Sequence, residues 1–562
     1  MTDFYPHPGI VLALGGLLVA VSRGAIRSAA VVLSPVVALA LIWSLPEGVL
    51  WRTDLLGYSV VPLEVDRLSR LFALVFGLMA FAGGWFALRQ ASPFEIPSAF
   101  LYAGSAIGVT LAGDLVSVFV WWELMAIGST LVIWCSGTPA SYRASVRYLM
   151  VHLFGGVVLF AGITGHIIDT GSTNFAPMSL DTASQWLILC GFLVNAGAPP
   201  LSAWLADAYP EASWSGTVFL SAFTTKTAVY TLLRCFPGTE LLIWIGLFMI
   251  FYGIVYALLE NDMRRILAYS IVNQVGFMVV GIGIGTELAL NGAAAHAFTH
   301  IIYKALLLMS AGSVLYATGR RKCSELGGLF HSMPVTTLCG IVGALAISSF
   351  PLTSGFISKS MVSQSAADGH LQLVWLGLTA ASAGVFLHAG IKFPWFVFFQ
   401  KDSGLRPADP PGSMRWPMYL FAALCIVLGL FPQLLYSMLP YRVTYEPYTM
   451  AHVLTQLQLL LFSGLAFFLA LPYLKRTPTI TLDADWTYRI LLTRAAHIAA
   501  DLYGRSREAV AALAQSGVER FTAALSRQHE PGSLLTRPRS TASMGLWIML
   551  LLLAHLVLYH SS

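Results

Sequence analysis

Apolar runs of membrane-spanning length recur along almost the whole chain, and short polar segments separate them. A helix needs about 20 mostly apolar residues to cross the hydrocarbon layer of a bilayer. The pattern therefore predicts an all-α polytopic membrane protein with about 16 transmembrane helices. The predicted spans are 9–22, 28–45, 70–88, 97–112, 115–136, 144–168, 185–209, 214–236, 240–259, 266–284, 289–318, 334–360, 372–398, 416–438, 452–473 and 543–559.

Composition supports a membrane protein and excludes several other classes. Apolar residues make up 57% of the 562 positions and charged residues only 10%. The six cysteines are scattered without any CxxC spacing, which argues against a disulfide framework, a zinc site or an iron–sulfur site. We expect no metal and no cofactor, and the net charge of +5 gives no reason to expect a nucleic-acid partner.

The distribution of Lys and Arg predicts the orientation in the membrane. Loops after odd-numbered spans carry thirteen basic residues, and loops after even-numbered spans carry five. A further ten lie between residues 474 and 541. Because basic loops stay on the cytoplasmic side, the odd loops are expected inside and the N-terminus outside. The first seven residues contain no Lys or Arg, which counts against a cleavable signal peptide.

Two predicted spans are interrupted by proline in matching ways. One breaks at Pro199 and Pro200, and the other at Pro351 and Gly355. Paired broken helices are typical of inverted-repeat transporters with binding sites at mid-membrane, although a proline kink can also be purely structural. The pattern predicts two inverted five-helix repeats. The predicted domains are N-terminal helices (1–96), a first repeat (97–236), a second repeat (240–398), C-terminal helices (416–473), a cytoplasmic helix (484–530) and a final span (543–559).

Residues 484–530 are too charged to span a membrane, but their apolar positions recur every three to four residues. This pattern predicts an amphipathic lateral helix along the cytoplasmic face, hinged at Gly504. The helix could strap neighbouring subunits together or could be a linker resting on lipid.

Glu123 is a carboxylate near the middle of the apolar stretch from Asp114 to Gly137. A charge at bilayer depth costs about 2.5–3.5 kcal/mol on insertion scales, so a buried ionisable residue points to an ion pathway. The alternative is a carboxyl group that is hydrogen-bonded to a neighbouring helix. Asp114 and Asp169 lie at span ends and are expected to be solvated.

Four lysines are placed inside predicted spans: Lys226, Lys304, Lys359 and Lys392. A buried lysine can release its proton readily. Lys226 and Lys359 are interpreted as pathway residues. His388 precedes Lys392 by four residues, and this pair could be functional or structural.

His296, His300 and Lys304 are spaced by four residues, so they share one helix face. No carboxylate lies nearby to complete a metal site, and the spacing suits a proton relay through imidazole. Histidines bonded to backbone in a tight bundle are the alternative. His152 and His166 are lone histidines, which are more often structural than functional.

Several segments resemble the antiporter-like subunit family of respiratory complex I, Mrp-type Na+/H+ antiporters and membrane-bound hydrogenases. They are FVWWELM, PLSAWLADAYP, KTAVYTLLR, NDMRRILAYSIVNQVG, HAFTHIIYKALLLMSAGS and GFISK, within about residues 60–400. The chain is most similar to the D-type subunits of Mrp antiporters, whereas the amphipathic helix and final span are more similar to the largest antiporter-like subunit of complex I.

The resemblance implies roles for matching residues. Glu123 corresponds to the glutamate of the fifth helix and Lys226 to the lysine of the eighth. His300 corresponds to the histidine of helix eleven and Lys359 to the terminal residue of helix twelve. The family's lysine before the PL of the seventh helix, the usual partner of the glutamate, is Asn195 here.

The leading hypothesis is a proton-translocating subunit of a multi-subunit Na+/H+ antiporter of Mrp type, in a bacterial inner membrane. Protons would pass along Glu123, Lys226, His300, Lys304 and Lys359, and other membrane subunits would be the partners. Such a subunit is an ion transporter rather than an enzyme. The alternatives are a subunit of an NADH:quinone oxidoreductase-like redox complex, a proton-driven subunit for inorganic-carbon uptake, and a subunit that only assembles others.

Overall fold

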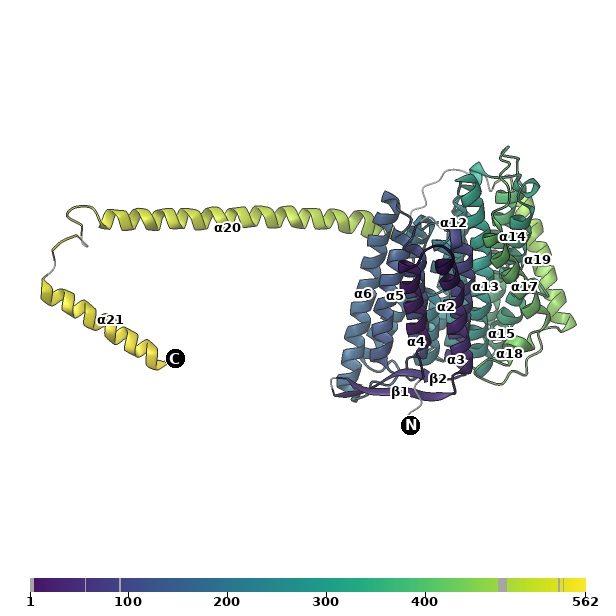
Figure 1. Ribbon diagram of the computed structural model, residues 1–562, viewed down its shortest axis with the longest axis horizontal. Helices are drawn as coiled ribbons and strands as arrows, with labels where there is room; N and C mark the ends of the chain where they lie inside the picture. Colours follow the sequence, from purple (N-terminus) through teal and green to yellow (C-terminus); the bar gives the residue numbers. More distant parts are fainter. Residues whose placement is uncertain are drawn as a thin grey trace. The chain divides into compact units, whose positions relative to one another are not determined.

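The computed structural model describes residues 5–55, 57–89, 92–473, 483–533, 536–538 and 540–561. The chain divides into two compact units, Met1–Asp485 and Trp486–Ser562. The first unit is a bundle of helices that run side by side (Figure 1). In this view α5 and α6 lie on one side of the bundle, α17 and α19 lie on the other, and α12 and α13 lie between them.

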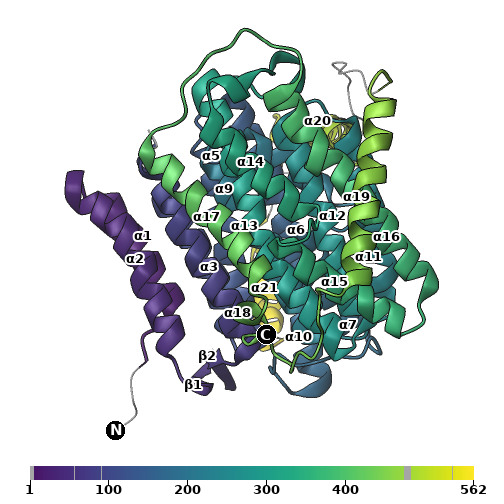
Figure 2. The ribbon, with the colours of Figure 1, turned by 90° about the vertical axis from the view of Figure 1, so that its right-hand side faces the viewer.

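The first half of this bundle extends to α10. Its helices are α1 (Pro8–Val21), α2 (Gly24–Ser44), α3 (Arg67–Phe86), η1 (Ala87–Arg89), α4 (Glu95–Leu111), α5 (Leu115–Trp134), α6 (Pro139–Thr170), α7 (Ala183–Ala196), α8 (Ala203–Ala208), η2 (Tyr209–Glu211), α9 (Gly216–Leu220) and α10 (Thr224–Cys235). Figure 2 shows α1 and α2 at one edge of the bundle.

The second half continues from α11 to α19. Its helices are α11 (Leu241–Leu259), α12 (Met263–Ile284), α13 (Glu287–Thr318), η3 (Cys323–Glu325), η4 (Leu329–His331), α14 (Pro334–Ile347), α15 (Ser354–Asp368), α16 (Gln372–Val385), the π-helical η5 (Phe386–Lys392) and η6 (Trp395–Phe399), α17 (Gly412–Leu430), α18 (Gln433–Tyr436) and α19 (Met450–Ala470).

Eleven helices within the described residues are long and apolar enough to cross a membrane. The chain is therefore an all-α polytopic membrane protein, as the sequence predicts. The other five predicted spans contain only helices shorter than eighteen residues: α1, α4 and three interrupted segments. The apolar stretch of α12 is fully buried and that of α13 is 78% buried, so these two helices form the centre of the bundle.

The two predicted breaks are present. α7 ends at Ala196 and is followed by Gly197 in the left-handed conformation, and the chain becomes helical again at Ala203. α14 ends at Ile347, and α15 begins at Ser354. Between them Ser349 and Leu352 have backbone φ angles of 58° and 69°, which residues other than glycine rarely adopt.

A third break lies where one continuous span is predicted. The segment 214–236 consists of α9 and α10, separated by Ser221, Ala222 and Phe223. The prediction of a single helix is wrong because no proline or glycine marks this interruption. Another irregular stretch follows α16, where η5 and η6 are π-helical.

A β-hairpin lies at the end of the bundle near the N-terminus (Figure 1). Its antiparallel strands are β1 (Gly48–Leu55) and β2 (Tyr58–Val65), which the sequence analysis missed. Asp114 holds β2 against α5, since its carboxylate accepts hydrogen bonds from the amides of Val61, Val116 and Ser117 at 2.7–2.9 Å. Asp114 is only 1% exposed, so the expectation that it is solvated is wrong.

The second unit contains η7 (Thr487–Leu491), α20 (Leu492–Gln528) and α21 (Thr541–Ser561). The predicted amphipathic helix is present as α20, and none of its residues is buried. It runs through Gly504 without interruption, so the predicted hinge is wrong. A glycine within a helix weakens it by about 1 kcal/mol relative to alanine, which does not end a long helix. α21 is the predicted final span.

Candidate functional site

Two of the four intramembrane lysines bind a carbonyl group at a helix break. Lys226 Nζ donates to the carbonyl oxygen of Ser221, directly after α9, at 2.7 Å. Lys359 Nζ donates at 2.7 Å to the carbonyl of Ile347, the last residue of α14. The last carbonyls of a helix lack intrahelical partners and carry partial negative charge, which stabilises an ammonium group there. Each of these breaks therefore holds an ammonium inside the bundle.

Lys226 and Lys359 are buried, with exposed fractions of 0% and 3%. Lys226 Nζ also donates to Thr225 Oγ1 at 3.0 Å. Lys359 Nζ lies 4.9 Å from the centroid of the Phe277 ring, which is within the range of a cation–π interaction. Neither ammonium forms an ion pair in the described part of the chain. Such weakly compensated ammonium groups can exchange protons with internal water.

Lys304 lies on the uninterrupted helix α13 and is fully buried. Its Nζ donates to Ser270 Oγ at 2.7 Å and to the carbonyl of Leu267 at 3.4 Å, both on α12. The third buried lysine is thus held by the two central helices.

His296 is held in one position by partners from α12 and α15. Nδ1 lies 3.1 Å from Ser358 Oγ, and Nε2 lies 3.1 Å from Gln274 Oε1. Tyr303 donates to the same Gln274 oxygen at 3.1 Å. Because Ser358 directly precedes Lys359, this network connects α13 to the second broken helix.

His300 is fully buried, and neither ring nitrogen has a hydrogen-bond partner within the ranges that the structure describes. It lies close enough to Lys226, Lys304 and Lys359 for their charges to interact with it. An imidazole can accept a proton at one nitrogen and release one at the other. His300 therefore lies among three lysines from both halves of the bundle.

Glu123 lies against α6, where glycine makes room for it. A Cβ atom at Gly156 would lie 2.1 Å from Glu123 Oε1, so only a residue without a Cβ fits beside the carboxylate in this position. That oxygen has no hydrogen-bond partner among the residues placed in the structure. Asn195, at the end of α7, faces the preceding glycine, since a Cβ at Gly155 would lie 3.7 Å from Asn195 Oδ1.

Asn195 is 1% exposed, and its amide oxygen and nitrogen both lack partners among the described residues. Among these residues no hydrogen bond or ion pair joins Glu123 to Asn195 or Lys226. The structure thus brings Lys226, His300, Lys304 and Lys359 close enough together for their charges to interact, and it leaves Glu123 outside that group.

Lys392 has a different environment from the other lysines. Its Nζ donates to the carbonyls of Ala257, Leu258 and Glu260 at 2.6–3.1 Å, at the C-terminal end of α11. An ammonium has three N–H donors, and all three are used here. His388 Nδ1 lies 2.8 Å from the carbonyl of Gly384, in the last turn of α16. This geometry favours a capping role for Lys392 over proton exchange.

A polar cavity of about 330 Å³ reaches Lys359. It lies between α15, α16 and the start of α19, and its lining includes Ser360, Gln364 and His452. α15 and α18 lie toward the end of the bundle that carries the β-hairpin (Figure 1). At that end Arg67, next to β2, binds the carbonyl of Ser437, directly after α18, at 3.3 Å. The cavity could supply water to Lys359 from that end.

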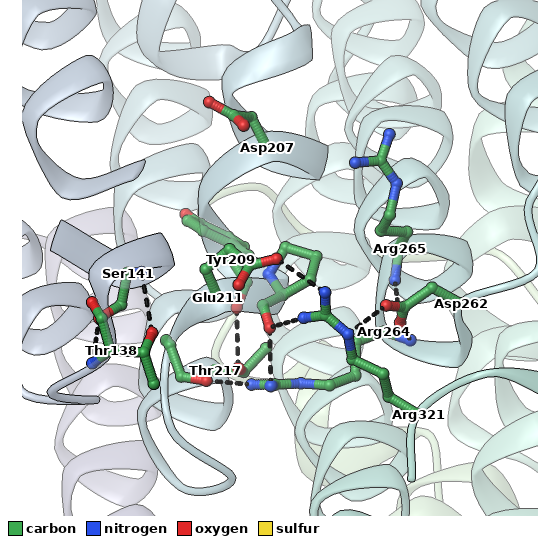
Figure 3. Close-up of polar contacts among 12 residues, drawn as sticks. Thr138, Ser141, Asp207, Tyr209, Glu211, Thr217, Asp262, Arg264, Arg265 and Arg321 are labelled. Carbon is green, nitrogen blue, oxygen red and sulfur yellow. Dashed lines mark hydrogen bonds and ion pairs between the residues drawn. The ribbon is translucent and has the colours of Figure 1, made fainter. Parts of the chain in front are cut away.

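A second polar cavity, of about 380 Å³, lies at the opposite end. Its walls include Glu211, Arg264 and Arg321, which belong to the charged cluster in Figure 3. Arg264 donates to the carbonyls of Pro210, Ala212 and Ser213 at 2.7–2.9 Å. Arg321 forms ion pairs with Glu211 at 3.0 Å and Asp262 at 2.9 Å. Burial raises the pKa of Asp262, and Arg321 acts in the opposite direction.

No local pattern in the sequence signals the role of this charged cluster. It joins the segment after the first broken helix to α12 and to the loop after α13, and thereby holds α8 and η2 in place. Arg147 of α6 makes a two-point ion pair with Asp207 of α8 at 2.6 and 2.8 Å, which serves the same purpose. The motif NDMRRILAY signals charge near a helix start, but only folding brings Arg321 to it.

These features define a polytopic ion-transport protein with ionisable residues at broken helices. The family model described as NADH:quinone oxidoreductase/Mrp antiporter matches residues 112–385. The chain belongs to the antiporter-like subunit family that Mrp antiporters share with NADH:quinone oxidoreductases.

Three comparisons illustrate the relationship. The probable K(+)/H(+) antiporter A/B subunit of Rhizobium meliloti (strain 1021) is 31% identical over 400 residues, covering 66% of this chain and 40% of the relative. The Na(+)/H(+) antiporter D subunit of Alkalihalophilus pseudofirmus (strain ATCC BAA-2126 / JCM 17055 / OF4) is 28% identical over 412 residues, covering 69% and 81%. A chain of the membrane-bound sulfane sulfur reductase, an archaeal respiratory membrane complex, superposes with a TM-score of 0.71 at 22% identity, covering 98% and 99%.

Proposed function

We propose that this chain is the proton-translocating subunit of a multi-subunit monovalent cation/proton antiporter of Mrp type, with Na+ as the exchanged cation. The observation that carries the proposal is the group of Lys226, His300, Lys304 and Lys359. They are buried together without carboxylate partners in the described residues, and they link both halves of the bundle. The relatedness to antiporter subunits supports the same conclusion.

Protons pass from Glu123 to Lys226, then through His300 and Lys304 to Lys359, and leave through the cavity that Lys359 lines. Each lysine alternates between ammonium and amine, and internal water carries the proton across gaps too long for a hydrogen bond. The breaks beside Lys226 and Lys359 let small backbone movements change the environment of each ammonium.

The positive-inside bias orients the bundle with its arginine-rich end in the cytoplasm and the β-hairpin outside. The charged cluster of Arg264 and Arg321 then lies on the cytoplasmic side, and the cavity beside Lys359 opens outward. The host membrane is a bacterial inner membrane, and the other membrane subunits of the antiporter are the partners.

A second candidate function is a proton-pumping subunit of a complex I-like redox complex, with electron transfer confined to partner subunits. The matching family model covers NADH:quinone oxidoreductase subunits as well as Mrp subunits, and this supports the alternative. In either complex this chain acts as a translocase and not as the redox enzyme itself.

Purification of the tagged protein from its native host in mild detergent distinguishes the two candidate functions. Small membrane subunits without redox centres support the antiporter, whereas flavin or iron–sulfur subunits support the redox pump.

Glu123→Ala tests the transport function in inverted vesicles that contain the complete complex. We expect Na+-dependent proton flux to be abolished while assembly is retained, because the carboxylate is the first group of the path. Glu240→Ala is the matched control, since it removes an exposed carboxylate before α11. Full flux in Glu123→Ala would contradict the proposal.

A further inference from the structure

We propose that His152 carries protons between Glu123 and Lys226, in the place of the lysine that Asn195 replaces. This inference rests on the proposed function and specifies the first transfer of its path. An amide is not a proton carrier in the physiological range, since Asn has no titratable group. A nearby imidazole supplies what Asn195 lacks.

His152 lies on α6, one turn before Gly156. Residues i and i+4 lie one above the other on a helix face, with about 5–6 Å between their Cβ atoms. Because Glu123 Oε1 occupies the space that a side chain at Gly156 would fill, the carboxylate lies beside the turn that carries His152. Internal water can carry a proton between the two groups.

The hydrogen bonds of His152 define its tautomer. Nδ1 lies 2.9 Å from the carbonyl of Tyr148, which can only accept, so the proton of the neutral ring is on Nδ1. Nε2 is buried and has no partner in the described part of the chain. Its lone pair is therefore available to accept a proton. The ring is 1% exposed and is held by stacking on Tyr148 at 3.9 Å and by an edge contact with Trp204 at 4.6 Å.

A series of hydroxyl groups begins at Tyr148, on whose ring His152 stacks, and leads toward Lys226. Tyr148 OH donates to Ser129 Oγ at 3.0 Å and lies 3.3 Å from Thr224 Oγ1. Thr224 Oγ1 is in turn 2.6 Å from Tyr102 OH. Thr224 is the first residue of α10, and the next residue, Thr225, accepts the hydrogen bond from Lys226 Nζ. Hydroxyl groups can donate and accept at once, so they can pass protons in sequence.

The transfer moves one proton from Glu123, which becomes a carboxylate, to Lys226, and it leaves His152 unchanged. Protonated Glu123 gives its proton through water to His152 Nε2, which forms imidazolium, and the O–H bond is replaced by an N–H bond. The imidazolium then releases a proton through water to the hydroxyl series, which delivers one to the amine of Lys226. Ammonium forms at Lys226, and His152 returns to the neutral ring.

The test uses His152→Gln in the complete complex, reconstituted in vesicles, with Na+-dependent proton flux as the measurement. We expect a loss of roughly 100-fold, the usual effect of removing a proton-transfer group, with subunit composition unchanged. His166→Gln is the matched control, because it changes a histidine on the same helix α6 and should leave the flux at the wild-type level.

The double variant His152→Gln/Asn195→Lys distinguishes proton transfer from a structural role. If His152 serves as a carrier, a lysine at position 195 restores the connection and raises the flux at least tenfold above that of His152→Gln. Wild-type flux in His152→Gln would overturn the proposal, and so would a loss that Asn195→Lys does not restore.

A wild-type complex without cation-coupled proton flux would refute the proposed function. His152 is then tested by NMR on the complex with 15N-labelled histidine, where the His152 signals are those missing from His152→Gln. We expect its titration midpoint to shift when Glu123→Gln is introduced and to remain unchanged with Glu240→Gln. A midpoint insensitive to Glu123 would overturn the proposal.

Discussion

At the scale of single residues, the four buried lysines differ in what they touch. Lys226 and Lys359 bind carbonyls at helix breaks, and Lys304 binds a serine hydroxyl. Lys392 uses all its donors on the end of α11. Their shared presence in apolar spans predicts that they are special, but their partners decide whether they exchange protons or hold a helix end.

We therefore expect Lys392→Met to lower the stability of the protein and to leave transport intact. Each carbonyl left buried without a donor costs about 1–3 kcal/mol, so we expect a lower unfolding temperature in detergent. Flux per folded complex should remain near the wild-type level. Lys359→Met is the comparison and should lose transport. Equal loss of flux in both variants would contradict this assignment.

We expect the opposite result for Gly156→Ala, namely a loss of transport without a loss of stability. The new methyl group would occupy the position of Glu123 Oε1, and the flexible carboxylate can rotate away. We expect nearly unchanged stability and a loss of proton flux similar to that of Glu123→Ala. Gly464→Ala is the control, since its Cβ would lie 3.5 Å or more from its neighbours. Normal flux in Gly156→Ala would show that the position of the carboxylate is not critical.

At the scale of secondary-structure elements, the breaks depend on close backbone contacts. A Cβ at Gly355 would lie 1.9 Å from the carbonyl oxygen of Ala346, so α15 can start against the end of α14 only with glycine there. This contact sets the distance between Lys359 and the carbonyl of Ile347.

Gly355→Ala should therefore move α15 away from α14. Overpacking of this kind costs typically about 1–3 kcal/mol, and we expect both a lower unfolding temperature and reduced flux. Since the clash is with backbone, no rotation of a side chain can relieve it, in contrast to Gly156→Ala. A variant with wild-type unfolding temperature and flux would refute the argument.

At the scale of the whole molecule, the two compact units differ in the candidate site residues they contain and in the apolar residues they expose. The first unit contains every candidate site residue. Near the end of this unit, Asp483 accepts hydrogen bonds from tyrosines of α11 and α12, with Tyr269 OH donating to Asp483 Oδ2 at 2.6 Å. The second unit exposes apolar residues along α20, among them Ile498 and Phe521, at 60% and 67%.

Deletion of residues 486–562 should leave the first unit folded. We expect the truncated chain to show the unfolding transition of the full chain within a few degrees, because its core lies entirely within residues 1–485. Co-purification of partner subunits should decrease, as α20 offers an exposed apolar face. Aggregation of the truncated chain would show that the units are not independent.

The sequence by itself determined the class of fold and most of the candidate residues. Apolar runs and the placement of Lys and Arg predict the helices of the bundle, because only helices satisfy their own backbone inside a bilayer. Prolines at 199, 200 and 351 signal two breaks, since proline cannot continue a helix. Glu123 and the lysines stand out because a charge in an apolar span is rare and costly.

The tertiary structure alone decided how these residues connect. The break between α9 and α10, the β-hairpin and the burial of Asp114 depend on contacts between distant segments, which leave no local pattern. For the same reason, the sequence could not separate Lys392 from the other lysines or place Glu123 beside Gly156. Partners from other helices determine what an ionisable residue does, and folding alone brings those partners together.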